Sequence, residues 1–281
     1  MATDPEIFRH KEWLGLLQPV GLVVSPPAVV KAQAVIDRTR VVDVQERLRD
    51  LVCADPIPGT TSGEEAWIKD FPAFAEQVLE WMPEDLVGAS GQEALPQQLE
   101  IVLPDYGETL KPTYAVRDPD SDSWLMLIQE VTPGQSLDEI DLTVEKGQGW
   151  RATVQEKFER LLRETEILIG LLDNGTHLRI VYAPRGESSG HLTFPVQAMS
   201  EVPGRLILGA LDMLLGAARL FNVPSERRLP KLLSDSRDYQ AEVSTKLADQ
   251  VLDALWELLR GFQTADAAVN GRLLSEIART D

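Results

Sequence analysis

Three aspartates at alternate positions, Asp118, Asp120 and Asp122, form the most conspicuous pattern in the sequence that could bind a metal ion. Alternating carboxylates begin the calcium loop of helix–loop–helix proteins, because oxygen ligands at this spacing converge on one cation. That loop also needs a central glycine and a closing glutamate, and neither stands at the required place here. We therefore predict a solvent-exposed turn at 118–122 and no calcium site.

The familiar catalytic motifs are absent from the sequence. It contains no Walker loop, no dinucleotide-binding glycine pattern, no nucleophile elbow and no zinc-type cysteine and histidine spacing. The three histidines, His10, His177 and His191, are too scattered in sequence to predict a metal site. There is also no S-adenosylmethionine loop and no Asn-Pro-Pro-aromatic motif, so we expect no methyl transfer by this chain alone.

The net charge of −18 disfavours a free-standing, nonspecific nucleic-acid binder, because a field of that sign repels phosphates at long range. A local basic patch remains compatible with this charge. Among the few basic clusters, we select Arg227, Arg228 and Lys231 as the first candidates for contact with DNA.

The sequence gives no sign of an oxidising compartment or a membrane. The single cysteine, Cys53, excludes an internal disulfide. The N-terminus does not resemble a signal peptide, and the longest apolar stretches are shorter than a membrane span. We expect a cytoplasmic protein without a membrane partner.

Hydrophobic periodicity predicts helices at both ends of the chain. Residues 28–52 follow a helical repeat, and the aromatic and aliphatic residues of 71–82 recur at helical spacing as candidate core residues. Near the other end, residues 206–220 and 239–260 carry apolar stripes, and Gly261 is the predicted stop of the last helix.

Short apolar runs predict strands in the middle of the chain. The runs are 99–103, 113–116, 124–131, 167–172, 178–182 and 191–194. The acidic segment 118–122 connects the second and third runs as a hairpin, and Asn174-Gly175 connects the fourth and fifth. An amphipathic helix is predicted between these hairpins, at 153–166.

Residues 165–182, an apolar run followed by an Asn-Gly turn and a strand, resemble a segment of the N-terminal nuclease domains of type I and type IIG restriction enzymes. Residues 103–116 and 229–244 are similar to the leading segments of large phage-defence proteins, including DISARM-like systems, in which an adenine-specific DNA methyltransferase domain follows. The resemblance covers essentially the whole chain.

This resemblance implies an α/β (α+β) fold with a restriction-endonuclease-like mixed sheet. It divides the chain into an N-terminal helical segment (1–95), a nuclease-like core (96–203) and a C-terminal helical segment (204–281). It also implies that Asp281 is a truncation point, with S-adenosylmethionine bound only in a methyltransferase domain beyond it. DNA and other subunits of the defence system are the implied partners.

Nucleases of this PD-(D/E)xK type hold Mg²⁺ with an acid on one strand and with Asp/Glu-x-Lys on the next, and the metal activates water. Alignment by strand register places Thr113 in the Asp position, Gln129 in the Glu position and Val131 in the Lys position. A hard dication prefers carboxylates, so none of the three suits metal chemistry.

Glu130 is the nearest acid that could replace the missing ligands. Side chains alternate across a strand, so Glu130 should face away from Gln129 unless a one-residue bulge turns it round. Asp105, Glu108 or Asp118 would then supply a second acid, and Glu46 a further one.

Three functions follow for consideration. The first is a catalytically inactive, nuclease-like scaffold region of a restriction-modification or phage-defence DNA methyltransferase, which positions DNA or a partner and binds no cofactor itself. The second is an active Mg²⁺-dependent endonuclease that uses Glu130, Asp105 and Glu46. The third is a free-standing acidic adaptor or DNA mimic.

Overall fold

The computed structural model describes residues 5–17, 19–21, 23–57, 65–121, 123–140, 149–268 and 270. The chain forms two compact units, Met1–Arg237 and Asp238–Asp281, which are described separately below. Within the described residues, no helix has the length and apolar character needed to cross a membrane.

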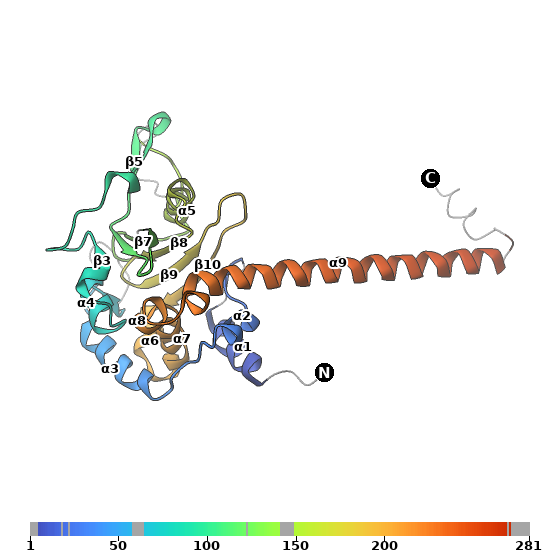
Figure 1. The fold of residues 1–281 in the computed structure, drawn as a ribbon, viewed down its shortest axis with the longest axis horizontal. Coiled ribbons are helices and arrows are strands. Elements are labelled where there is room, and N and C mark those ends of the chain that lie inside the picture. The colour runs from blue at the N-terminus through green and yellow to red at the C-terminus, as the bar shows by residue number, and fades with distance from the viewer. Residues whose placement is uncertain are drawn as a thin grey trace. The chain divides into compact units, whose positions relative to one another are not determined.

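A six-stranded mixed sheet lies at the centre of the first unit (Figure 1). The spatial order of its strands is β10 (Gly190–Pro195), β9 (His177–Tyr182), β8 (Ile169–Asp173), β7 (Trp124–Glu130), β6 (Tyr114–Arg117) and β3 (Leu86–Val87). Only β7 and β8 are parallel, and helix α5 (Val154–Thr165) connects them. The expected mixed α/β fold is therefore confirmed.

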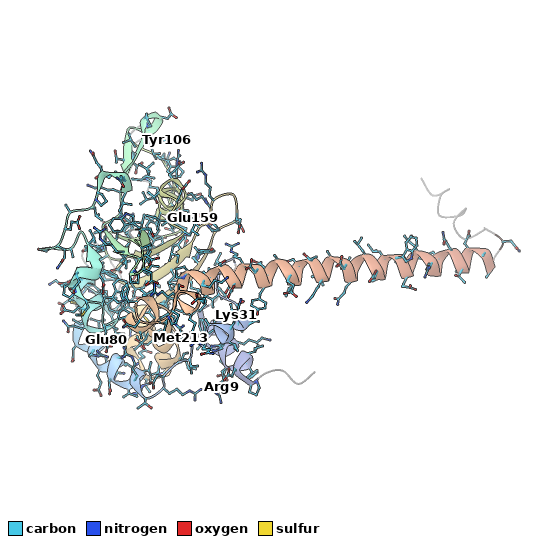
Figure 2. The ribbon with its side chains drawn as sticks, in the orientation of Figure 1. Arg9, Lys31, Glu80, Tyr106, Glu159 and Met213 are labelled. Carbon is cyan, nitrogen blue, oxygen red and sulfur yellow. The ribbon has the colours of Figure 1, made fainter. Side chains whose placement is uncertain are left out.

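Helices and two small two-stranded sheets accompany this sheet. The helices are α1 (Pro5–Leu17), α2 (Pro26–Lys31), α3 (Arg40–Leu51), α4 (Phe71–Gln77), α6 (Val196–Ser200), α7 (Arg205–Leu215), α8 (Ala217–Leu220) and α9 (Leu229–Ala268), with short 3₁₀ turns η1 (Pro83–Asp85), η2 (Gln97–Leu99), η3 (Pro104–Tyr106), η4 (Val202–Gly204) and η5 (Ser225–Arg227). Two small antiparallel pairs join β1 (Val52–Cys53) with β2 (Trp67–Ile68), and β4 (Ile101–Leu103) with β5 (Glu108–Leu110). In Figure 2, Tyr106 marks the tip of the β4–β5 hairpin and Glu159 marks α5.

The sheet separates two hydrophobic cores. Met126 and Ile128 of β7 pack into the larger core, which the helices of the N- and C-terminal regions complete. Leu127, between them, packs into the smaller core with Phe158 and Leu161 of α5. Alternation along β7 thus assigns neighbouring residues to opposite faces of the sheet.

Helix α5 begins at a capping box. The Glu156 amide donates to the Thr153 hydroxyl (3.1 Å), and the Thr153 amide donates to the Glu156 carboxylate (2.8 Å). Both bonds satisfy amides that the first turn of a helix leaves without partners. The helix then packs its apolar face, Phe158 and Leu162, directly onto Gly170 of β8.

Both predicted hairpins form, with β6 against β7 and β8 against β9. Gly175 takes the positive φ that the Asn-Gly turn requires. Asp118 and Asp120 lie in a turn, where the Asp120 amide donates to the Asp118 carboxylate (2.9 Å). Asp122 lies outside the described residues.

Three helix predictions were wrong in their bounds. The helix expected at 28–52 is interrupted between α2 and α3, where Gln33 has a φ of 52°. Arg219 holds this break by donating to the Ala32 carbonyl (3.1 Å). The helix expected at 206–220 divides at Gly216, which has an extended backbone. The last helix continues past Gly261 to Ala268, because a glycine lowers helix stability without ending a helix by itself.

The larger core takes side chains from all three segments proposed from the sequence, such as Trp81, Phe194 and Leu233. Strand β3, from the first segment, forms one edge of the sheet. The division at residues 95 and 203 stays a prediction.

We predict that Gly170→Ala destabilises the fold by about 1–3 kcal/mol, the usual cost of overpacking a core. An added Cβ would lie 2.3 Å from the Phe158 ring, so α5 would have to move off β8. Gly15→Ala is the control, because this site on α1 has open space and alanine favours the helix. Urea unfolding of both variants measures the difference; equal stabilities would contradict the proposed packing.

Candidate functional site

Thr113 and Gln129 lie in contact at the ends of neighbouring strands. The Gln129 side-chain amide donates to the Thr113 hydroxyl (3.3 Å), and the Glu130 backbone amide donates to the same oxygen (3.0 Å). Thr113 is anchored in turn, since its amide donates to the Ile128 carbonyl (2.8 Å). The two positions aligned with the metal-binding acids of nucleases therefore come together as a neutral hydrogen-bonded pair.

A cavity of about 320 Å³ lies beside Gln129, between β5, β7 and α5. Val131 lines it, together with Lys111 and Lys157. Lys157 forms an ion pair with Glu108 (2.5 Å), whose second carboxylate oxygen accepts a hydrogen bond from the Trp150 amide (2.7 Å). Glu108 is thus fully engaged by donors of the chain.

These residues do not fit a Mg²⁺ ion. The cavity presents a single carboxylate, Glu108, which is already paired with Lys157. Thr113 and Gln129 offer neutral oxygens, while Mg²⁺ is held in proteins mainly by carboxylates and water. Nor do the described residues contain a group of three or more histidine, cysteine, aspartate or glutamate side chains placed to hold a metal ion.

Glu130 lies on the opposite face of the sheet, in a cavity of about 470 Å³ that Asp70, Trp81 and Tyr114 also line. The Tyr114 hydroxyl donates to the Glu130 carboxylate at 2.6 Å. Burial raises the pKa of Glu130, and the charge of Asp70 raises it further, against the lowering effect of the Tyr114 hydrogen bond. Burial likewise raises the pKa of Tyr114, and Glu130 adds to this shift.

The bulge that would bring Glu130 to the other face does not form. Pairing between β7 and β8 continues without interruption from Leu127–Gly170 to Glu130–Asp173. The register shift between β6 and β7 lies at the far end of the pair, between Val116 and Arg117.

Asp173 is the nearest neighbour of Glu130 on β8, and it is almost fully buried. Its carboxylate accepts a hydrogen bond from the Gly175 amide (2.7 Å). Burial raises the pKa of Asp173 to about 7; the Gly175 bond lowers it, and the charge of Glu130 raises it. Two adjacent carboxyl groups with raised pKa values therefore lie at the ends of the parallel strands.

Asp70, Tyr114 and Asp173 were not among the candidates chosen from the sequence. The alternation along β6 is a signal for Tyr114, since it places this residue on the same face as Glu130. Asp173 precedes an Asn-Gly turn, so its sequence context explains it as a turn residue and gives no indication of its proximity to Glu130.

The other candidate acids lie apart from Glu130. Asp105 is exposed in η3, and Glu46 is exposed on α3. Neither lines the cavity that holds Glu130. Asp118 takes part in an ion pair with Arg228 (3.6 Å). The structure therefore does not assemble Glu130, Asp105 and Glu46 into one group.

The candidate basic residues differ in their surroundings. Arg228 is buried, forms an ion pair with Asp120 (2.7 Å) and donates to the Val223 carbonyl (2.8 Å). Lys231 forms an ion pair with Asp235 (2.8 Å). Arg227 is exposed in η5. Arg227 and Lys231 are thus exposed, whereas Arg228 stabilises the turn at 118–120.

Comparison with protein-family models gives a match to the family described as MmeI, N-terminal domain, over residues 59–261. The chain belongs to this family. The matched range contains the whole six-stranded sheet and both cavities. No curated protein and no solved structure matches the chain. The chain thus contains an N-terminal region of restriction-modification enzymes.

We predict that Asp173→Asn stabilises the protein increasingly as the pH rises from about 4 to about 7. A pKa of about 7 for Asp173 means that the folded protein favours the protonated carboxyl. The protonated form therefore stabilises the wild-type protein at low pH, and this stabilisation is lost as the pH rises through 7. Asparagine keeps the acceptor for Gly175 and does not ionise. At pH 8 the free energy of unfolding of the variant should exceed that of the wild type by up to about 4 kcal/mol. This is the shift from 3.8 to about 7 at about 1.4 kcal/mol per pKa unit.

Denaturant unfolding of both proteins at pH 5 and pH 8 measures this advantage. Titration of the histidines cancels, because it affects both proteins alike. A variant whose advantage is the same at both pH values would show that Asp173 titrates normally.

Proposed function

We propose that this chain is a catalytically inactive, nuclease-like scaffold of a bacterial restriction-modification or phage-defence DNA methyltransferase. It positions DNA or another component of the system, while the chemistry takes place in other parts of the protein. Membership of the MmeI N-terminal domain family supports the assignment to restriction-modification.

The hydrogen bond between Gln129 and Thr113 carries the claim of inactivity. In an active nuclease of this type the same two positions would be carboxylates, and their mutual repulsion would be balanced by the metal. Here an amide donor meets a hydroxyl acceptor, so the pair is satisfied without a cation.

One observation favours a second candidate, an active endonuclease that uses displaced carboxylates. Glu130 and Asp173 are adjacent, partly or fully buried and raised in pKa, which is common at catalytic sites. Against this, the carboxylates accept hydrogen bonds from Tyr114 and from the Gly175 amide. The surrounding fold satisfies the pair, so we favour a structural role for it.

The acidic charge bears on how the scaffold would meet DNA. With a net charge of −18, contact with DNA would have to be local and sensitive to salt. An acidic adaptor or DNA mimic is the third candidate, and it rests on this charge alone. Family membership gives the restriction-modification assignment more weight.

We predict that Thr113→Asp combined with Gln129→Glu creates a Mn²⁺ or Mg²⁺ site that the wild-type chain lacks. The two new carboxylates would lie in contact, as the native side chains do, and carboxylates attract a hard dication. Isothermal titration calorimetry with MnCl₂ measures the gain, and circular dichroism confirms that the variant folds.

Adding Glu130→Gln to the double variant is the matched control. It should leave the new metal affinity unchanged, because Glu130 faces the other cavity. Wild-type protein that binds Mn²⁺ as tightly as the double variant, or a site that disappears with Glu130→Gln, would contradict the assignment.

We also predict that alanine substitution of two neighbouring arginines affects different properties, fold stability at Arg228 and DNA binding at Arg227. Arg228→Ala should destabilise the fold by about 1–3 kcal/mol, because it removes buried hydrogen bonds and leaves Asp120 without its partner. Arg227→Ala should leave stability within about 0.5 kcal/mol. It should weaken DNA binding and lower the salt slope by about one.

Thermal unfolding and fluorescence anisotropy with duplex DNA over a range of salt concentrations measure the two effects. Unchanged DNA affinity in Arg227→Ala would remove η5 from the DNA interface and would leave the inactive-scaffold assignment in place.

A further inference from the structure

A further cavity, of about 420 Å³, lies between α1, the segment that connects α2 to α3, and the start of α7. It shares no lining residue with the two cavities described above. Of its own lining residues, only Leu206 lies within the range that matches the MmeI N-terminal domain family. The cavity therefore belongs to a part of the chain whose role the family match leaves open.

A buried tryptophan fixes the orientation of His10 in the wall of this cavity. The Trp13 indole nitrogen, which can only donate, gives its hydrogen to His10 Nδ1 at 3.1 Å. Burial lowers the pKa of His10, with Glu6 raising it and Arg9 lowering it by smaller effects, so the ring is neutral at neutral pH. A neutral imidazole carries a single N–H group. Since Nδ1 accepts a hydrogen bond, that N–H group is at Nε2.

The Nε2–H group of His10 is a donor that the described residues leave without an acceptor. Only 6% of the residue is exposed. Because Nδ1 is directed at Trp13, Nε2 is directed away from it, and the ring contributes to the cavity wall. Buried donors in proteins are nearly always paired. The group therefore calls for an acceptor atom inside the cavity.

Two arginines add positive charge to the same cavity. Arg9, labelled in Figure 2, precedes His10 on α1, and Arg38 lies in the segment before α3. Neither guanidinium group takes part in an ion pair or a hydrogen bond with another residue that the structure describes. By contrast, the nearby Arg40 is paired with two carboxylates. A guanidinium group can donate two parallel hydrogen bonds to a carboxylate or a phosphate, so these arginines favour an anionic ligand.

The two acidic residues in the wall have other roles. Asp37 Oδ1 accepts hydrogen bonds from the amides of Arg40 (3.0 Å) and Thr39 (2.9 Å), which lower the pKa of Asp37. Glu6 lies in the first turn of α1, where the helix dipole stabilises a negative charge. The positive charge of the two arginines is therefore available to a ligand.

The remainder of the wall is apolar. Val35 is 68% exposed, and Ile36 and Leu206 are partly buried at the edge of the larger core. Small-molecule sites in proteins combine an apolar wall with a few polar groups that orient the ligand, in volumes of about 300–1,000 Å³. The apolar side chains favour a ligand with a hydrocarbon part, which a DNA phosphate does not offer.

We propose that this cavity binds a small organic acid. The carboxylate of the ligand accepts hydrogen bonds from His10 Nε2 and from the guanidinium groups of Arg9 and Arg38, and its hydrocarbon part lies against the apolar wall. Such a ligand joins α1 to α7 and to the segment between α2 and α3, so its binding also stabilises the first unit.

Titration of 3-phenylpropanoate into the full chain, in about 0.15 M salt, is the first test. At this ionic strength the net charge of −18 is screened beyond about 8 Å. We expect a dissociation constant on the order of 1 mM, as is usual for a ligand of this size, and slower exchange of the His10 ring N–H with water in nuclear magnetic resonance spectra. The uncharged analogue 3-phenylpropanamide should bind about tenfold more weakly, because it loses charge-assisted hydrogen bonds.

Substitutions then test the residues. Arg38→Gln and His10→Asn should each weaken the binding of 3-phenylpropanoate about fivefold or more. Asparagine keeps an acceptor for Trp13 but is too short to present a donor to the cavity. Arg151→Gln is the matched control, because it removes the same charge from an exposed arginine outside the cavity and should leave the affinity unchanged. Circular dichroism confirms folding, and the exposed position of Arg38 keeps the test decisive if His10→Asn does not fold.

Three results would overturn the proposal: no binding of 3-phenylpropanoate, equal affinity for the acid and the amide, or unchanged affinity in Arg38→Gln. Inorganic phosphate that binds as tightly as 3-phenylpropanoate would also overturn it, because the apolar wall would then contribute nothing. None of these outcomes depends on whether the nuclease-like site is active.

Discussion

Strand β7 lies inside the sheet with hydrophobic core on both of its faces, and this position fixes the direction of its side chains from Met126 to Glu130. Leu127 faces α5, so Gln129 and Val131 line the cavity on that side, while Ile128 and Glu130 face the other core. A one-residue shift would move apolar residues out of both cores at once. The uninterrupted pairing with β8 therefore keeps the neutral residue Gln129 on the α5 side, at the position that we aligned with a nuclease acid.

The polar groups on each face of β7 have their own hydrogen-bond or ion-pair partners. On the α5 side, Thr113 accepts from Gln129, and Lys157 neutralises Glu108. On the other side, the Tyr114 hydroxyl donates to Glu130, and the Asp173 carboxylate accepts a hydrogen bond from the Gly175 amide. The polar groups at the ends of the strands are thus paired with one another. This pairing is what we expect of the proposed scaffold role.

Much of the local structure follows from short-range sequence signals. The capping box at Thr153, the Asn-Gly turn and the alternating runs of β6 and β7 lead to the observed elements. The strand register also brings Thr113 and Gln129 into contact. Contacts between distant segments do not follow in the same way. The break after Ala32 depends on Arg219, and the burial of Arg228 depends on a turn more than a hundred residues earlier. Likewise, the neighbourhood of Glu130 depends on a parallel pairing that no local pattern specifies.

Plasmid nicking with Mg²⁺ or Mn²⁺ tests the central claim most directly, with the purified wild-type chain and its Glu130→Ala variant compared under the same conditions. We predict no metal-dependent nicking by either protein, because Thr113 and Gln129 occupy the positions that we aligned with the metal-binding acids of nucleases. Nicking by the wild-type chain that Glu130→Ala abolishes would contradict it, and would identify the face of the sheet with Glu130 and Asp173 as an active site.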